Sequence, residues 1–503
     1  MAALTLAACS PQKNITGGSQ TKYNSVLLAP ADTEADMVRK AANVVPTPRQ
    51  LRWQKLELTG FFHFGINTFT GREWGDGKED PALFNPTQLD AGQWVRAAKE
   101  GGIKQVILTA KHHDGFCLWP TATTAHSVKS SPWKGGKGDV VKEVAEACKK
   151  EDIGFGIYLS PWDRNAAVYG TDEYNTFFVQ QLTELLTNYG RIDEVWFDGA
   201  NGEGPNGKKQ VYDFGRWYKL IRELQPQAVI AIMGPDVRWV GTETGYGREQ
   251  EWSVVPADNL DQQAVAGASQ KGVAFKPQGD MRGDDLGSRE KILKAKGLVW
   301  YPAETDVSIR PGWFYNAAED DKVKTPEKLL DIYFHSVGRN GVLLLNIPPD
   351  KRGLVHENDV KCLRAWKEFR DDIFGVNLAK AATLNATNGT AVKALVDGNE
   401  ETHFTTTGEE TTATIEMNFK TPQTVNVLAL QENIREGQRI EKFVLEYWKE
   451  GGWKKAAEGT TVGYKRLVQF DAISADKMRL RILSSRLSPY LAEVGLYRKQ
   501  QNP

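Results

Sequence analysis

Cysteine is scarce in this sequence, and its placement excludes two common kinds of site. Cys9, Cys117, Cys148 and Cys362 form no C-x-x-C pair, so neither the spacing of a zinc ribbon nor a dense disulfide framework is present. A Gly-rich loop of the kind that cradles phosphate is missing, as is a Ser in a nucleophile elbow. Beyond the first residues, no run reaches the roughly 18 apolar residues that span a bilayer.

An excess of charge of one sign is also lacking. The 63 Lys and Arg residues nearly balance the 64 Asp and Glu residues, and the two signs are interspersed. This balance argues against nucleic acid or another charged polymer as the main partner and suits a neutral ligand. Tryptophan is abundant instead, with 15 residues; indole rings suit stacking on the apolar faces of sugars, although most Trp residues in any fold are core.

The N-terminal segment LTLAACS places small residues before Cys9 and is similar to the lipobox of a bacterial lipoprotein signal. An acylated Cys9 would make the chain a cell-envelope lipoprotein, periplasmic or anchored in the outer membrane. Because Lys and Arg are absent before Cys9, a full signal would need an upstream extension, and an ordinary apolar N-terminus is the alternative. We expect residues 1–45 to form this remnant and a polar arm.

Residues 46–375 alternate short apolar runs with helical patterns, which predicts a parallel sheet. Eight runs over some 310 residues favour a (β/α)8-like TIM barrel, with a helix lost or irregular in its second half. The eight expected strands are 60–67, 104–115, 154–163, 192–200, 228–236, 251–255, 298–306 and 341–349.

Residues 376–503 have a different pattern of apolar and polar residues. Alternating segments such as TATIEMNF, TVNVLALQE and KMRLRIL are separated by turns rich in Gly, Asn and Asp, and long helical patterns disappear. This pattern predicts an antiparallel β-sandwich that follows the barrel.

Asp198 ends a hydrophobic run, in EVWFDGANGEG. In an extended segment Trp196 and Asp198 point one way while Val195 and Phe197 point the other. Asp198 is therefore either a site carboxylate beside an aromatic ring or merely a cap of the following Asp-Gly turn.

The active site of a barrel lies at the carboxyl ends of its strands, and the residues expected there are carboxylates, imidazoles and aromatics. Paired carboxylates in an aromatic cleft suit glycosidic cleavage, because one stabilises the oxocarbenium-like centre while another protonates the leaving oxygen. A metal held by His112, His113 and Asp114 is the alternative. Adjacent strand residues face opposite sides, so one ion could hold both imidazoles only if the strand has broken; no catalytic metal is expected.

Seven segments in this order resemble glycoside hydrolase family 29, the retaining α-L-fucosidases. They are HFGINTFTGREWGDG, ILTAKHHDGFCLWPT, YLSPWDRN, VWFDGANG, GPDVRWVGTETGYGREQEWSV, DVSIRPGWFY and LLLNIPPD. They are most similar to the bacterial branch that removes α-1,3- and α-1,4-linked fucose from branched, Lewis-type glycans. The resemblance implies a barrel that hydrolyses fucosylated oligosaccharides or glycoconjugates by double displacement, without a catalytic cofactor.

By this resemblance Asp198 would be the nucleophile and Glu243 the acid/base, with Glu304 as the main rival for the second role. A retaining mechanism places the two carboxyl groups about 5–5.5 Å apart. The resemblance also implies a set of sugar-binding residues, namely His63, Glu73, Trp74, His112, His113, Tyr158, Trp196, Arg238 and Trp313. Trp313 is expected near the C6 methyl of fucose, and Arg238 is also a cation that would keep Asp198 ionised.

The C-terminal segment resembles discoidin-like, family 32 carbohydrate-binding modules. Asp397 and Thr402 sit where such modules often hold a structural Ca²⁺, although a plain Asp-Gly turn is the alternative. Two other functions remain open at this point: a barrel glycosidase for another neutral or deoxy sugar, and a non-catalytic surface glycan-binding lipoprotein. The oligomeric state is open as well.

Overall fold

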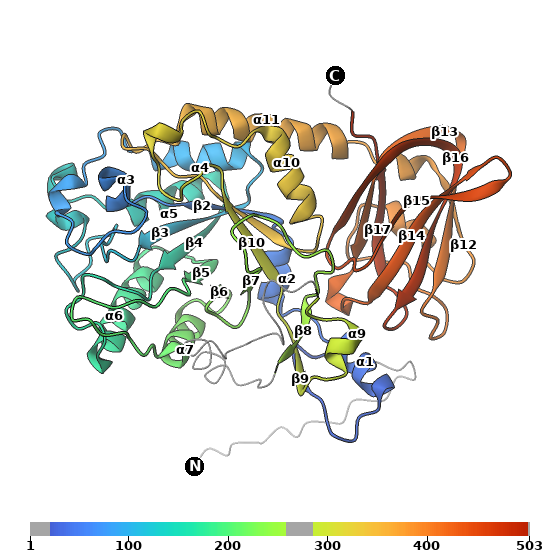
Figure 1. Cartoon of the computed structure of the whole chain (residues 1–503), viewed down its shortest axis with the longest axis horizontal. Coiled ribbons are helices and arrows are strands. Elements are labelled where there is room, and N and C mark those ends of the chain that lie inside the picture. Colours follow the sequence, from blue (N-terminus) through green and yellow to red (C-terminus); the bar gives the residue numbers. More distant parts are fainter. Residues whose placement is uncertain (1–20, 258–284, 501–503) are drawn as a thin grey trace, which may run out of the picture.

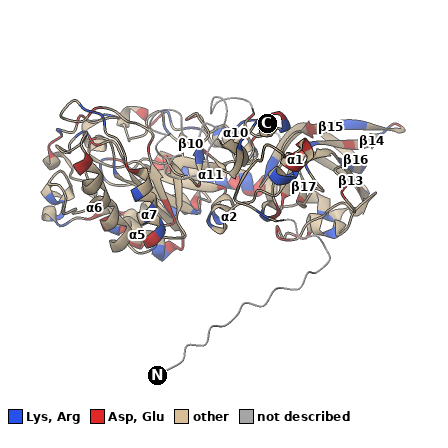
Figure 2. Ribbon diagram, turned by 90° about the horizontal axis from the view of Figure 1, so that it is seen from below, with Lys and Arg blue, Asp and Glu red and all other residues tan. Residues whose placement is uncertain are grey.

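The computed structural model describes residues 21–257 and 285–500. Figure 1 shows a barrel surrounded by helices beside a domain built almost entirely of strands. Figure 2 shows acidic and basic residues interspersed over both parts, as the near-zero net charge led us to expect. Among the helices of the described residues, none is both long enough and apolar enough to cross a bilayer.

The first part is a parallel barrel, which confirms the predicted fold class. Its sheet runs in the order β6-β5-β4-β3-β2-β11-β10-β7, and a bridge between Ala231 and Val237 brings its two edges together. The strands are β2 (Leu58–Phe62), β3 (Gln105–Lys111), β4 (Gly154–Leu159), β5 (Glu194–Phe197), β6 (Val229–Ile232), β7 (Arg238–Trp239), β10 (Ala303–Ser308) and β11 (Val342–Asn346).

Helices cover the outside of the barrel where the apolar spacing predicted them. Three of them begin at an Asp, namely Asp90, Asp139 and Asp213, whose carboxylate accepts a hydrogen bond from a backbone N–H of the first turn. Such caps satisfy a donor that the helix leaves unpaired. The main helices are α4 (Ala91–Glu100), α5 (Val140–Glu151), α6 (Asp172–Asn188), α7 (Phe214–Leu224), α10 (Pro326–His335) and α11 (Glu357–Phe374).

Two of the expected strands were assigned wrongly. The run 251–255 enters β8 (Val254–Ala257), which pairs with β9 (Gly297–Trp300) in a small antiparallel sheet outside the barrel. The run 298–306 is therefore split between β9 and β10. The two-residue strand β7 takes the place in the barrel that we expected for the run 251–255. Only residues 233–237 connect β7 to β6. Apolar runs indicate burial but do not say in which sheet a strand is buried.

The expected polar arm is partly folded. Within residues 21–45, β1 (Ser25–Leu27) pairs with β9, and α1 (Glu34–Ala42) begins at a capping box on Thr33. Helix α2 (Pro48–Gln54) follows and brings Trp53 to the interior of the barrel. Cys9 lies outside the described residues, so its acylation and the envelope location stay predictions.

Side chains of β5 alternate between the inside and the outside of the barrel, as predicted. Val195 and Phe197 pack outward against the helices, whereas Trp196 belongs to a separate cluster inside the barrel. Because Asp198 continues the inward-facing series, the strand delivers it to the mouth of the barrel rather than to the helical layer.

The second part is an antiparallel β domain, as predicted. It contains β12 (Thr383–Ala386), β13 (Ala413–Glu432), β14 (Ile440–Lys449), β15 (Gly452–Gly459), β16 (Arg466–Ser485) and β17 (Leu491–Tyr497). The two 20-residue strands β13 and β16 pair along their length with register shifts, and such irregularities let long strands bend. Alternate residues face a buried core that includes Met417, Phe443 and Leu480.

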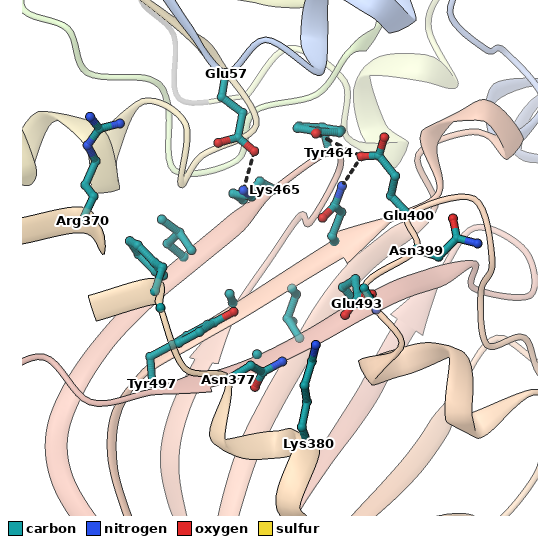
Figure 3. A pocket seen from close by; sticks show the side chains of 18 of the residues that line it. Glu57, Arg370, Asn377, Lys380, Asn399, Glu400, Tyr464, Lys465, Glu493 and Tyr497 are labelled. Carbon is teal, nitrogen blue, oxygen red and sulfur yellow. Dashed lines mark hydrogen bonds and ion pairs between the residues drawn. The ribbon is translucent and has the colours of Figure 1, made fainter. Parts of the chain in front are cut away.

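The two parts meet at a polar seam. Glu57 at the bottom of the barrel forms an ion pair with Lys465, and the backbone N–H of Tyr464 donates to Oδ1 of Asn340 at 2.7 Å. Beside these contacts lies a cavity of about 900 Å³, lined by both parts. Figure 3 shows Glu57, Arg370, Lys465, Tyr497 and their neighbours around it.

Candidate active site

Asp198 lies at the mouth of the barrel, one residue beyond β5. Its Oδ1 accepts the backbone N–H of Ala200 at 2.6 Å, and its Oδ2 accepts Tyr158 Oη at 3.3 Å. Nε2 of His113 lies 4.0 Å from the same Oδ2, and the Asp198 side chain is 27% exposed. The bond to Ala200 is the turn cap considered above, so Asp198 both caps its turn and presents a carboxylate oxygen to the mouth.

His63 follows β2 and is held by an amide of β11. Its Nδ1 lies 2.9 Å from Oδ1 of Asn346, while Nδ2 of Asn346 donates to the carbonyl of Trp313 at 2.8 Å and fixes the amide orientation. Burial lowers the pKa of His63 to about 3. The ring is therefore neutral with its proton on Nδ1, which leaves Nε2 as a hydrogen-bond acceptor.

His112 and His113 lie on the same side of the chain, contrary to the argument from strand alternation. Strand β3 ends at Lys111, and the two rings lie 4.1 Å apart. Nδ1 of His113 contacts Ser160 Oγ at 2.7 Å. Burial lowers the pKa of both imidazoles; the neighbouring His113 lowers the pKa of His112 further, whereas the charge of Asp198 opposes the shift at His113. The break in the strand removes our geometric reason for excluding a shared metal ion.

Within the described residues, no group of three or more His, Cys, Asp or Glu side chains could hold a metal. In the C-terminal domain, Asp397 accepts the backbone N–H of Asn399 and the hydroxyl of Thr402, at 2.8 Å each. These contacts are those of an Asp turn. A structural Ca²⁺ at this turn stays a prediction.

Two stacked aromatic rings form the floor of the site. The rings of Tyr158 and Trp196 lie 5.1 Å apart at 28°, and the His112 ring also stacks with Tyr158, at 5.7 Å. The indole N–H of Trp196 donates to Oε1 of Glu304 at 2.7 Å. Glu304 is completely buried, so it lies beneath this floor and not at the mouth.

A rim of loops holds the remaining predicted residues. Glu73 accepts backbone N–H groups of Trp313 and Phe314 at 3.0–3.2 Å, and Nε1 of Trp313 donates to Glu243 at 3.4 Å. The Trp313 ring lies 5.1 Å from that of His63. Glu73 therefore ties the loop after β2 to the loop after β10, and this second loop contacts Glu243.

Trp74 stands at the entrance with its side chain 57% exposed. Its ring meets the rings of His113 and Trp162 edge-on, each at 5.5 Å. An exposed indole held by two buried rings is a surface on which a sugar can stack.

Arg238 does not join the other predicted site residues at the mouth of the barrel. Its guanidinium donates to the carbonyl of Tyr301 at 2.9 Å and to that of Trp252 at 3.0 Å, and it forms an ion pair with Glu251. All three partners lie on the outer side of β7, because Arg238 faces outward and its neighbour Trp239 faces inward. Glu251 also pairs with Arg248 and is buried, which agrees with a structural role.

Sequence reasoning missed two residues that shape the mouth. Asn346 orients His63, and the inward-facing Trp239 donates to Oδ1 of Asp306 at 2.7 Å. Burial first, and nearby Glu304 and Glu243 in addition, raise the pKa of Asp306 well above its usual value. The inward parity of β11 could have identified Asn346, but Trp239 required the unexpected strand β7.

The fold and the site together define a class of protein. A parallel barrel with carboxylates, imidazoles and aromatic rings gathered at the carboxyl ends of its strands is the architecture of a glycoside hydrolase. A family model described as "Alpha-L-fucosidase" matches residues 49–370, and one described as "F5/8 type C domain" matches residues 379–493. The chain belongs to the α-L-fucosidase family, glycoside hydrolase family 29.

Individual relatives agree with this assignment. Alpha-L-fucosidase 1 of Arabidopsis thaliana is 44% identical over 465 residues, which are 90% of this chain and 87% of the relative. A Bacteroides ovatus protein of known crystal structure is 52% identical, with a TM-score of 0.85 over 96% of this chain and 79% of its own. A Ruminococcus gnavus GH29 fucosidase in complex with fucose is 30% identical, with a TM-score of 0.79 over 95% and 97% of the two chains.

Proposed function

We propose that this α-L-fucosidase removes terminal α-1,3- and α-1,4-linked L-fucose from branched, Lewis-type glycans with retention of configuration. The observation that carries the mechanism is the position of Asp198, an inward-facing carboxylate held at the barrel mouth by Tyr158 and the Ala200 amide. The linkage preference is supported by the resemblance of the seven sequence segments to the bacterial branch of the family.

The reaction consists of two inverting displacements. Asp198 attacks the anomeric carbon while the protonated carboxyl of Glu243 gives its proton to the leaving sugar oxygen. Water then attacks the fucosyl-enzyme, and Glu243 takes a proton from this water. The choice of Glu243 over Glu304 is supported by their surroundings: Glu243 lies exposed on the rim, whereas Glu304 is sealed under Trp196.

Recognition of fucose falls to the neutral imidazoles and the aromatic rings. His63 Nε2 accepts a sugar hydroxyl, and His112 and His113 bind others, because neutral imidazoles both donate and accept. Trp313 offers an apolar surface to the C6 methyl. Galactose would bring a hydroxyl to that surface and leave it unpaired, which costs about 1–3 kcal/mol.

The nucleophile is tested by Asp198→Gly. The variant should be nearly inactive, and added azide should restore turnover of an activated aryl fucoside and give a fucosyl azide of inverted configuration. The small anion enters the space of the lost carboxylate and attacks from the same face. A rescued product of retained configuration would refute the assignment.

The linkage is tested with the wild-type enzyme. Release of free fucose from a Lewis-type trisaccharide should be much faster than release from a 2-linked fucoside of the same length, with an aryl fucoside as the common reference. Equal rates on both glycans would refute the linkage proposal and leave the fucosidase activity intact.

A further inference from the structure

Two carboxyl groups are buried together inside the barrel, below the proposed sugar site. Glu194 is the first residue of β5 and Glu304 the second residue of β10, and both are 0% exposed. Their surroundings are mainly apolar and include Phe61, Ile107 and Leu344. The mechanism proposed above uses neither group.

Each carboxyl has one oxygen with indole or amide donors and one oxygen without them. Glu194 Oε2 accepts Trp53 Nε1 at 3.0 Å and Gln105 Nε2 at 2.6 Å, and Glu304 Oε1 accepts Trp196 Nε1 at 2.7 Å. Glu194 Oε1 and Glu304 Oε2 are buried and receive no hydrogen bond from any donor group of the described residues. The two carboxyls are nevertheless near enough for each to shift the pKa of the other.

Ionisation of both groups would be very costly. No Lys, Arg or His of the described residues is paired with either carboxyl, and two buried like charges in contact repel strongly. A protonated carboxyl, in contrast, supplies the O–H donor that the facing oxygen lacks. Burial first, and the charge of Glu194 second, raise the pKa of Glu304 well above its usual value.

We propose that Glu194 and Glu304 share one proton in a carboxylic acid–carboxylate hydrogen bond, and that this pair fixes the Trp196 indole beneath the sugar. Glu304 is then a positioning residue. Trp196 stacks on Tyr158, which in turn donates to Asp198, so the pair supports both the floor of the site and the surroundings of the nucleophile. The effect on activity rests on the proposed contact between Trp196 and fucose.

Single amide substitutions should preserve this arrangement. In E304Q the amide oxygen accepts from Trp196 and the amide N–H donates to the ionised Glu194. In E194Q the oxygen accepts from Trp53 and Gln105, and the N–H donates to the ionised Glu304. Each single variant should keep kcat and KM on an aryl fucoside within about threefold of wild type.

The double variant E194Q/E304Q should behave differently. In this variant the donors Trp53, Gln105 and Trp196 still need the two side-chain amide oxygens as acceptors. If both oxygens accept these bonds, the two amide NH2 groups face each other with no acceptor between them. One side chain must therefore turn, and its indole hydrogen bond breaks. We expect kcat to fall about a hundredfold. We also expect the unfolding equilibrium constant to rise by more than the product of the two single effects. If the effects of the two substitutions on unfolding simply multiply, the shared proton is refuted.

Infrared spectra give a readout that does not depend on activity or on the double variant folding. Wild-type protein at neutral pH should show a protonated-carboxyl C=O band that is lost in E304Q and equally in E194Q. Other carboxyls contribute the same background to every variant, so the band is read from the difference between wild type and variant. E249Q is the exposed control. An unchanged band in both single variants would overturn the proposal.

The stability profile provides a second such readout. A carboxyl whose folded pKa is raised contributes stability below its unfolded pKa and loses it as pH rises through the folded value. The pair holds its one proton to a higher pH in the folded chain than in the unfolded chain, so wild-type stability should fall as pH rises above the ordinary pKa of Glu. E304Q leaves the pair no proton to hold at neutral pH and should flatten that fall. If the double variant is destabilised by more than the two single variants together but keeps its kcat, the shared proton is supported and the contact of Trp196 with the sugar is refuted.

Discussion

At the scale of single residues, the site is organised by what each side chain can donate or accept. Asp198 receives two donors and keeps part of its surface open, whereas Glu304 has the same carboxyl group but lies sealed beneath an indole. Chemical type alone therefore does not separate the proposed nucleophile, the proposed acid and the supporting carboxyls. Depth in the barrel does, because depth determines which of them water and substrate can reach.

The proposed acid/base role of Glu243 leads to a prediction at this scale. Glu243→Ala should lower kcat on a Lewis-type trisaccharide by about 10²–10⁴-fold, because its poor leaving group needs a proton. An activated aryl fucoside should lose far less in its first step. Rates on both substrates, measured across pH, check this.

Glu249→Ala is the matched control from the same loop. Its side chain is 71% exposed, and it is expected to behave as wild type on both substrates. Equal losses on the two substrates in Glu243→Ala would move the acid role to another carboxyl.

At the scale of elements, the short connection from β6 to β7 is the unusual feature of the barrel. A parallel neighbour is normally reached through a helix, yet residues 233–237 suffice here. Asp236 holds this connection: its carboxylate accepts Arg49 Nε at 3.1 Å, Arg222 at 2.5 Å and the backbone N–H of Ile230 at 2.8 Å. One buried carboxylate thus links α2, α7 and β6.

Asp236→Ala should lower the free energy of unfolding by about 3 kcal/mol, because it leaves two arginines and one backbone donor without their shared acceptor. Asp236→Asn keeps one acceptor oxygen and should lose less. Urea denaturation with fluorescence detection measures both.

Asp371→Ala removes an exposed ion pair with Lys367 and should change stability by no more than about 0.5 kcal/mol. If Asp236→Ala were no worse than this control, the connection would not depend on Asp236.

At the scale of the whole molecule, the C-terminal domain is joined to the bottom of the barrel, opposite the mouth. Burial is the largest single influence and would raise the pKa of Glu57. The charge and hydrogen bond of Lys465, helped by Lys104 and Tyr333, together outweigh burial and lower the pKa. The pair therefore contributes stability above the ordinary pKa of Glu, and this contribution is lost as pH falls through the lowered folded value.

Lys465→Met should lower the free energy of unfolding by about 3 kcal/mol at neutral pH, since it strands a buried carboxylate. Burial would then raise the pKa of Glu57, so the variant should be more stable in mild acid than at neutral pH. Urea unfolding at several pH values checks both statements.

Lys477→Met removes a partly exposed ion pair with Glu416, 3.7 Å away, and should cost less than about 1 kcal/mol. A pH profile for Lys465→Met that is parallel to that of wild type would contradict the prediction.

The sequence by itself determined the periodicity and therefore the classes of element. Alternation within β5 set which side chains enter the barrel, helical spacing indicated α4, α5 and α7, and the alternating pattern after residue 376 indicated the antiparallel domain. These features are local, because they depend on neighbours one to four residues apart. The motifs likewise indicated the family and placed Asp198 at the mouth.

Only the tertiary structure decided which apolar runs share a sheet and which polar groups meet. It placed 254–257 outside the barrel, made β7 a barrel strand, turned Arg238 outward and brought His112 and His113 side by side. It also buried Glu194 and Glu304 near each other inside the barrel although they are 110 residues apart in the sequence. Such choices depend on contacts between distant segments, and a short apolar run carries no record of its eventual partner.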